Sequence, residues 1–425
     1  MIEAYLMHEK ERNAQGIPAL PLNPEQTTSL CELLQSPPAG KEEFLMSLFT
    51  ERVSPGVDPA AEVKAGFLAD ILTGSRKSPL IDKKQAVQIL GTMIGGYNVQ
   101  PLFSALSDAS LADDAASALS GLTYLYDAAA EVLELAKSNT AAKKVAESWA
   151  NAEWFTNKPA MPETITVKVF KVEGEINTDD FSPAGDAWSR PDIPLHALAM
   201  GKTRFPGGIE DIAKWRLEGH QVAFVGDVVG TGSSRKSACN SVLWYIGDDI
   251  PCVPNKRRGG VIIGSVIAPI FFNTAQDSGA LPLKMDVTKL NMGDVVTINT
   301  AKGEVTNEAG DVVTTFDIKP NTVPDEYRAG GRIPLIIGRS LTAEAREALG
   351  MGEVDIFAQP DNPTPQPGQG YTQAQKMVGK ACGVEGVLPG TACEPLMTTV
   401  GSQDTTGPMT ADEIKELACL KFKSP

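Results

Sequence analysis

The sequence has few of the residues that build disulfide scaffolds, metal centres and membrane spans. Its 425 residues include 6 cysteines and 3 histidines, and its aromatic content is 6%. No two cysteines form a Cys-x-x-Cys pair, and so few in so long a chain do not indicate a disulfide framework. No apolar run is long enough to cross a bilayer, and residues 1–20 lack the pattern of a secretory signal. We therefore expect a globular, cytoplasmic protein.

The charge balance is acidic. The formal net charge of −15 at pH 7 argues against broad attraction to nucleic acid or anionic membranes. A local basic pocket joining Arg235 and Lys236 to residues 256–258 could still bind a small anion, so we expect a small acidic ligand. The three histidines offer no acid–base or metal site and are expected at the surface or in caps: His8, His196 and His220.

The most informative segment is the glycine-rich stretch 226–236, GDVVGTGSSRK. It follows the apolar run 222–225, a pattern that predicts a strand, a turn and then a helix. Gly230 and Gly232 allow backbone angles that other residues avoid, and a helix N-terminus presents free N–H groups and a positive dipole end. The turn thus places two hydroxyls and a guanidinium where they can hold a carboxylate or a phosphate: Ser233, Ser234 and Arg235.

Three other interpretations of this turn stay open. A Walker A loop needs Gly-Lys before Ser or Thr, whereas here Arg235 precedes Lys236. A dinucleotide fingerprint needs a glycine where Arg235 stands, although Asp248 lies near the distance expected of a ribose-binding acid. A plain strand-to-helix turn capped by Ser233 needs no ligand, but it leaves a guanidinium beside two serines unexplained.

Residues 25–155 have the pattern of short amphipathic helices separated by proline or glycine. The pattern fits a HEAT-like stack of helix pairs or a plain helical bundle, without a cluster of chemical groups. We assign residues 1–160 to this helical domain. It is scaffold or interaction surface rather than a reaction site.

From residue 161 the pattern becomes mixed α/β, and we assign 161–357 to a second domain. Helices are expected near 208–218, 234–247 and 342–349, and residues 307–311 predict a hairpin turn. Strands are expected at 165–169, 222–229, 261–267, 295–299, 303–306, 311–318 and 333–337. The proline-rich stretch 358–370 has a linker composition, and 371–425 is short for an independent core.

Three further patches share the anion-handling character of the central turn. Each alone has an ordinary interpretation as a cap, a surface charge or a polar turn. The patches are 177–185 (NTDDFSPAG) with Arg190 shortly after it, 270–274 (IFFNT) and 401–407 (GSQDTTG). Their joint occurrence is what indicates a site.

Six separated blocks together resemble the bacterial aconitase B family: NTDDFSPAG, DAWSRPDIPLHALAM, GDVVGTGSSRKSACNSVLW, APIFFNTAQDSGALPL, AGGRIPLIIGR and VGSQDTTGPMT. The resemblance covers essentially the whole chain. It implies a HEAT-like helical solenoid, an α/β swivelling domain and the start of domains that hold a [4Fe-4S] cluster. It also implies a hydro-lyase that interconverts citrate and isocitrate through cis-aconitate, with 2-methylisocitrate dehydration in some members.

Carried onto this sequence, the resemblance makes Ser233 the catalytic base, acting as an alkoxide on the substrate carbon acid. It makes Ser234 and Arg235 ligands of one substrate carboxylate and Arg190 a contact of another. It assigns further substrate contacts to Gln403, Asp404 and Thr405. The chemistry agrees, because a serine is a weak base unless a helix N-terminus and a cation activate it, and a tricarboxylate needs more than one fixed cation.

The chain departs from the family pattern at its C-terminal end. A complete aconitase B has several hundred further residues, among them the three cysteines that bind the cluster. Cys382, Cys393 and Cys419 do not follow a cluster spacing and are expected to be structural. We therefore expect the cluster ligands outside this chain, and the chain to be the N-terminal part of the enzyme.

Two alternative functions stay open. The helical stack could be a non-catalytic module for dimerisation, for partner proteins or for RNA, which the family is known to bind, although residues 1–155 show no basic stripe with interleaved aromatics. The chain could also be the small subunit of a two-chain dehydratase, but the helical block and the QDTTG segment argue against this. We expect a tricarboxylate ligand, a homodimer through the helical domain and no membrane partner.

We predict that the purified chain alone does not turn over citrate or isocitrate. Dehydration in the family needs a metal that polarises the leaving hydroxyl, and the sequence offers no such centre. The absorbance of cis-aconitate, followed with each substrate, measures this. Steady formation of cis-aconitate without an added cluster-bearing partner would contradict the prediction.

Overall fold

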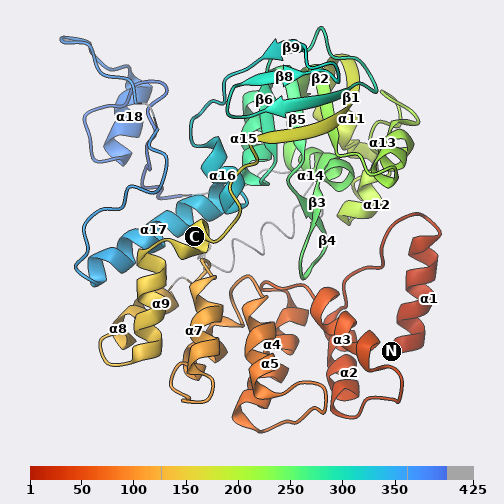
Figure 1. The fold of residues 1–425 in the computed structure, drawn as a ribbon, viewed down its shortest axis with the longest axis vertical. Helices are drawn as coiled ribbons and strands as arrows, with labels where there is room; N and C mark the ends of the chain where they lie inside the picture. Colours follow the sequence, from red (N-terminus) through yellow and green to blue (C-terminus); the bar gives the residue numbers. More distant parts are fainter. Residues whose placement is uncertain (126, 361, 400–425) are drawn as a thin grey trace.

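The computed structural model describes residues 1–125, 127–360 and 362–399, with a helical region beneath a region built on a β-sheet (Figure 1). The helical region comprises, in chain order, α1 (Ile2–Asn13), α2 (Pro24–Gln35), α3 (Glu42–Glu51), α4 (Pro59–Thr73), α5 (Lys83–Gly91), α6 (Val99–Ala105), α7 (Ala112–Ser120), α8 (Asp127–Leu135), α9 (Thr140–Ala150) and α10 (Glu153–Thr156). Within the described residues, none of the helices combines the length and apolar character needed to cross a membrane.

The helices begin where the sequence supplies caps. Asn23 and Asp82 form capping boxes at α2 and α5, and Asp58 caps α4 just before a proline at its first position. Their apolar faces meet in one core that includes the fully buried Leu34 and Leu68. The prediction of short helices over 25–155 is therefore confirmed.

A second region follows, in which parallel and antiparallel strands share one sheet. The order of its strands is β6-β5-β2-β1-β7-β8-β9, with β1, β2, β5 and β6 parallel and the rest antiparallel to their neighbours. Its strands are β1 (Thr164–Asn177), β2 (Val222–Thr231), β5 (Val261–Ile267), β6 (Leu281–Lys284), β7 (Val295–Asn299), β8 (Glu304–Thr306) and β9 (Val312–Thr315). A separate hairpin is formed by β3 (Asp248–Ile250) and β4 (Val253–Arg258).

Several helices cover one face of this sheet, and strand side chains, loops and α16 fill the other. The helices of this part of the chain are α11 (Thr178–Phe181), α12 (Ile193–Ala197), α13 (Gly208–Leu217), α14 (Arg235–Ile246), α15 (Pro269–Asp277), α16 (Val323–Ala329), α17 (Arg332–Ala348) and α18 (Gln373–Ala381), with a 3-10 turn at Ala184–Asp186. Because β1, β2 and β5 are parallel, their last residues lie at one edge, with Asn177 opposite Thr231 and Val229 opposite Ile267. Ligand sites of such sheets lie at this carboxyl edge.

The strand predicted at 333–337 is wrong, because this segment is the first part of α17 (Figure 1). Leu335, Gly338, Leu341 and Ala345 are buried at helical spacing against α9 and Trp154, whose indole donates a 2.9 Å hydrogen bond to Thr342. A short apolar run does not distinguish a buried strand from a buried helix, and here the helical spacing continues beyond it. The strands β3, β4 and β6 were not predicted.

Besides the packing of α17 on α9, polar contacts join the helical and sheet regions at two further places. At the β3–β4 hairpin, Asn255 donates to the carbonyl of Ala19 at 2.9 Å and accepts from Arg52 at 3.0 Å. Nearer the N-terminus, the guanidinium of the largely buried Arg12 donates hydrogen bonds to both carboxylate oxygens of Asp192, at 3.1 and 2.5 Å. Asp192 is the N-cap of α12, so the helical region holds one end of that helix.

Replacing Arg12 with alanine should lower the free energy of unfolding by about 2 kcal/mol, because it leaves a partly buried carboxylate without its bidentate partner. Arg76→Ala is the control, since its ion pair with Asp70 is nearly half exposed and should contribute less than about 1 kcal/mol. Urea unfolding of both variants measures the difference. If both substitutions lower the free energy of unfolding equally, the Arg12 ion pair does not stabilise the contact between the regions.

Candidate anion-binding site

Strand β2 ends in the predicted glycine turn, where φ is +82° at Gly230 and +108° at Gly232. A Cβ atom on Gly230 would lie 2.2 Å from the ring of Phe271, and one on Gly232 would lie 2.5 Å from the hydroxyl of Thr178 and 2.6 Å from Oδ1 of Asn177. Glycine is therefore required at both positions by angle and by space. The turn brings together three segments that the sequence singled out separately: 177–185, 226–236 and 270–274.

Helix α14 begins directly after this turn, and its N-terminus has no side-chain cap. Ser234 is the N-cap residue, yet its hydroxyl makes no capping hydrogen bond. In the part of the chain that the structure describes, no hydrogen bond of the Ser233 or Ser234 hydroxyl is found; Ser233 is exposed and Ser234 is buried. Two hydroxyls and the uncapped N–H groups of the first turn are therefore available to an anion.

The guanidinium of Arg235 lies over the same turn. Its Nη1 donates a 3.1 Å hydrogen bond to the carbonyl of Ser233, which holds the side chain back over the helix start. One nitrogen is thus used for positioning, and guanidinium groups have further N–H donors for a ligand. The structure therefore places Ser233, Ser234 and Arg235 together, as the sequence predicted.

Of the two acidic residues in 177–185, Asp180 takes part in a helix cap through its carboxylate. Asn177 accepts from the backbone N–H of Asp179 at 2.9 Å, and Asp180 accepts from the backbone N–H of Asn177 at 2.8 Å. These bonds form a capping box at α11. They fix the orientation of Asn177, which lies against Gly232.

Arg190 is held by other groups. Its Nε lies 3.5 Å from Asp186, which also pairs with Lys202, and its Nη1 donates to the carbonyl of Leu195 at 3.1 Å. Among the described residues, no hydrogen bond or ion pair joins Arg190 to Ser233, Ser234 or Arg235. The segment that carries Arg190 continues into α12, which packs against α14.

His196 lies in α12 and is fully buried, so its expected place at the surface or in a cap is wrong. Its Nε2 is 2.8 Å from the hydroxyl of Ser182, which donates to Ser237 at 2.8 Å; Ser237 donates to the carbonyl of Ser234 at 3.1 Å. Burial lowers the pKa of His196, an effect that the charge of Asp186 opposes and the charge of Arg190 reinforces. A single histidine between Leu195 and Ala197 gave no periodic signal that could have revealed this role.

The predicted basic pocket is not formed. Residues 256–258 lie in β4, where Arg257 pairs with Asp249 at 2.7 Å and bonds to the carbonyl of Trp244 near the C-terminal end of α14. Arg235 stands at the opposite end of this helix, nine residues before Trp244, which corresponds to about 14 Å at the usual rise per residue. The helix itself separates the two basic groups.

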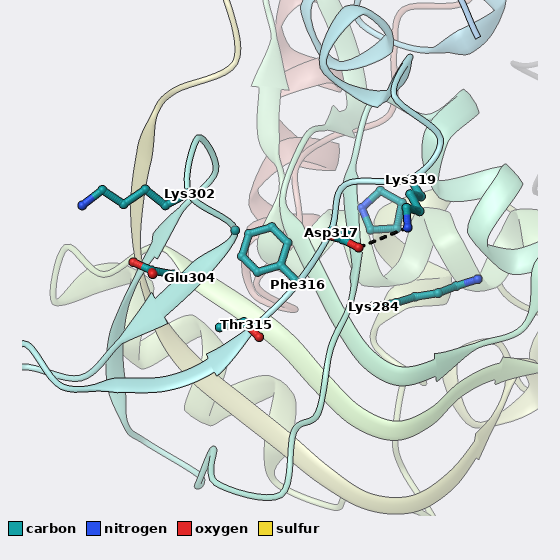
Figure 2. Close-up of a pocket in the computed structure, with 9 residues that line it drawn as sticks. Lys284, Lys302, Glu304, Thr315, Phe316, Asp317 and Lys319 are labelled. Atoms are coloured by element: carbon teal, nitrogen blue, oxygen red, sulfur yellow. Dashed lines mark hydrogen bonds and ion pairs between the residues drawn. The ribbon is translucent and has the colours of Figure 1, made fainter. Parts of the chain in front are cut away.

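A surface cavity of about 690 Å³ lies elsewhere, beside β6, β8 and β9 (Figure 2). It is lined by Phe316 and by several charged residues, among them Lys284, Lys302 and Lys319, but by none of the predicted site residues. Figure 2 shows the Lys302 and Lys284 amines extended in opposite directions, and Lys319 is paired with Asp317 at 3.1 Å. These cations do not converge on a ligand.

The described residues do not fit an iron–sulfur cluster. Among them, no three histidine, cysteine, aspartate or glutamate side chains are close enough to hold a metal ion. The described cysteines are free thiols, and burial raises the pKa of Cys31 to about 12, which disfavours the thiolate that binds metals. Cys419 lies outside the described residues, as do the predicted substrate contacts Gln403, Asp404 and Thr405.

Comparisons with known proteins identify the class. The family described as "Aconitate B N-terminal domain" matches residues 4–155, and the family described as "Aconitate hydratase 2 N-terminus" matches residues 167–371. The helical region and the sheet region are thus both aconitase modules. The chain belongs to the aconitate hydratase B family, whose N-terminal portion it matches.

Individual relatives agree with this assignment. Aconitate hydratase B of Synechocystis is 60% identical over all of this chain and 49% of its own length, and that of Escherichia coli is 58% identical over all of this chain and 50% of its own length. The chain therefore spans about half the length of these curated relatives. A 3-isopropylmalate dehydratase small subunit from Nitratidesulfovibrio vulgaris is 26% identical over 40% of this chain and 92% of its own length.

The close approach at Gly232 makes a specific prediction. Gly232→Ala should lower the free energy of unfolding by about 2–3 kcal/mol, because its Cβ adds a steric clash with α11 to an unfavourable backbone angle. Gly310→Ala is the matched control, since φ is +88° there and nothing lies within 4 Å of the added atom. Thermal and urea unfolding compare the two. If the control costs as much, close packing at the turn is not what requires glycine.

Proposed function

We propose that this chain supplies the substrate-binding and proton-abstracting groups of an aconitate hydratase, which interconverts citrate and isocitrate through cis-aconitate. The observation that carries the proposal is the uncapped start of α14 at the carboxyl edge of the sheet, where one guanidinium meets two hydroxyls that have no hydrogen-bond partner among the described residues. Membership of the aconitate hydratase B family supports the same substrate class. Dehydration of 2-methylisocitrate is a second reaction that the same groups would serve.

In this proposal each group has a distinct role. Ser234 and Arg235 bind one substrate carboxylate, helped by the first-turn N–H groups and the helix dipole. Arg190 contacts a second carboxylate. Ser233, as an alkoxide stabilised by the same positive end, takes the proton from the carbon beside a carboxylate.

The exposures of the two serines fit this division. Ser233 is exposed and can reach a substrate carbon above the turn, whereas the buried Ser234 lies at the base of the site. A hydroxyl at the base is suited to a fixed hydrogen bond with a carboxylate oxygen. Gln403, Asp404 and Thr405 complete the substrate contacts in the proposal.

The proposal extends to the domain organisation. Residues 1–160 form a HEAT-like domain that also serves homodimer formation, and 161–357 form the swivelling domain. Residues 358–370 are the linker to a further α/β domain that starts within 371–425, and the enzyme with its [4Fe-4S] cluster works in the cytoplasm. RNA binding by the helical domain stays a prediction, and no described feature favours it over tricarboxylate binding.

Citrate binding to the 425-residue chain, measured by isothermal titration calorimetry, tests the assigned roles. Arg235→Lys should raise the Kd about 10-fold because lysine keeps the charge but loses the bidentate fork. Ser234→Ala should weaken binding by a similar factor through the loss of a hydrogen bond to a charged group, about 1.4 kcal/mol. Ser233→Ala should change the Kd by less than about 3-fold, since a base acts on the transition state more than on the bound ground state.

The matched control is Arg76→Lys, which alters an exposed guanidinium in the helical region. Its Kd for citrate should equal that of the unchanged chain. If Arg235→Lys and Arg76→Lys behave alike, the start of α14 is not the carboxylate site. If Ser233→Ala weakens binding as much as Ser234→Ala, Ser233 is a ligand rather than the base.

A further inference from the structure

We infer that His196 is a positioning residue that couples the two carboxylate-binding arms, Arg190 on one side and Ser234 with Arg235 on the other. The inference rests on the proposed function for the identity of the arms. It concerns a residue to which neither the family resemblance nor the site prediction gave a role. Its basis is a buried path from Arg190 to Ser234 that is made of hydrogen bonds and of the covalent link between Leu195 and His196.

The path begins at Arg190. This side chain does not touch the start of α14 among the described residues, but its Nη1 bonds to the carbonyl of Leu195, the residue before His196. The imidazole of His196 then contacts Ser182 at 2.8 Å, and Ser182 donates to Ser237 at 2.8 Å. Ser237 lies in the first turn of α14 and donates to the carbonyl of Ser234 at 3.1 Å.

Burial makes this path consequential. His196, Ser182 and Ser237 are each 0% exposed, so water cannot replace a lost partner. Removing one member leaves the other polar groups buried without hydrogen-bond partners. The surrounding backbone is then expected to shift until these groups find partners. The position of α12 relative to the start of α14 is therefore fixed by polar contacts at this end.

Apolar packing also holds α12 against the other end of α14. Ile193 and Ala197 of α12 pack against Trp244, which lies near the C-terminal end of α14. Ser237 and Trp244 are seven residues apart, which corresponds to about 10 Å along a helix. Without the polar path, α12 would keep its contacts with Trp244 and, through Asp192, with Arg12, but it would lose its link to the first turn of α14. The distance between Arg190 and Arg235 would then be less tightly set.

A ligand that spans both arms depends on this distance, whereas a ligand that uses one arm does not. A ligand already bound at one arm gains a second contact only if the other arm lies at the distance that the ligand spans. We therefore expect His196 to affect the binding of a tricarboxylate and to leave the binding of a monocarboxylate nearly unchanged. A role in stability alone would weaken both ligands in proportion.

The experiment uses the full chain with tricarballylate, which has three carboxylates and no hydroxyl to eliminate, and with acetate. His196→Leu should raise the Kd of tricarballylate about 10-fold and that of acetate by less than about 2-fold. His196→Gln, whose amide nitrogen can occupy the place of Nε2, should restore the Kd to within about 3-fold. Ser182→Ala, a smaller change in the middle of the path, should reproduce the effect of His196→Leu if the leucine variant does not fold.

A second measurement needs no ligand. The backbone N–H of Ala238 bonds to the carbonyl of Ser234 at 3.0 Å, so its hydrogen exchange reports on the first turn of α14. Exchange should accelerate about 10-fold in the His196→Leu and Ser182→Ala variants, while the N–H of Gly247 at the other end of the helix keeps its rate.

The outcomes separate this inference from the proposed function. If the unchanged chain does not bind tricarballylate, the proposed function fails, and the exchange data alone decide whether His196 positions the helix start. If the chain binds tricarballylate but His196→Leu weakens both ligands equally, or leaves Ala238 exchange unchanged, the positioning role is overturned.

Discussion

The architecture of the site depends on one close approach, that of the Gly232 backbone to Asn177 and Thr178. Strands β1 and β2 are parallel and end side by side, so the helices that follow them begin at the same edge of the sheet. Two helix starts can meet there only if one of them carries no side chain at the point of contact. The absence of a Cβ at this position lets the turn before α14 lie against the end of β1 and the start of α11.

A second constraint is the layer of buried polar groups below that edge. Thr178, Ser182, His196, Ser234 and Ser237 are all buried, although most of the surrounding core is apolar. A helix without an N-cap hydrogen bond is less stable than a capped one by about 1 kcal/mol. Proteins commonly retain such costs where binding requires free donors, and here the buried hydrogen bonds below the turn keep the uncapped helix start in place.

The sequence predicted those features that depend on local chemistry. The glycine turn, the start of α14 and the strand at 261–267 follow from backbone preferences and short-range patterns, and the structure shows them at the expected residues. The features it missed depend on distant partners. The burial of His196 depends on its hydrogen-bond partners Ser182 and Ser237. The helix at 332–348 depends on packing against α9. The separation of residues 256–258 from Arg235 depends on the length of α14. The roles of individual site residues, including those outside the described part, remain predictions.

Helix α17 has a consequence for how the chain acquires its structure. Leu341 and Ala345 belong to the apolar core of the helical region, although the chain makes them about 190 residues after α9 and only once every strand of the sheet has been completed. During synthesis the N-terminal helices therefore emerge with one side of α9 uncovered, and they stay incomplete until α17 leaves the ribosome. The helical region and the sheet region are consecutive in sequence but interdependent in folding, since α17, which follows the strands of the second, closes the core of the first.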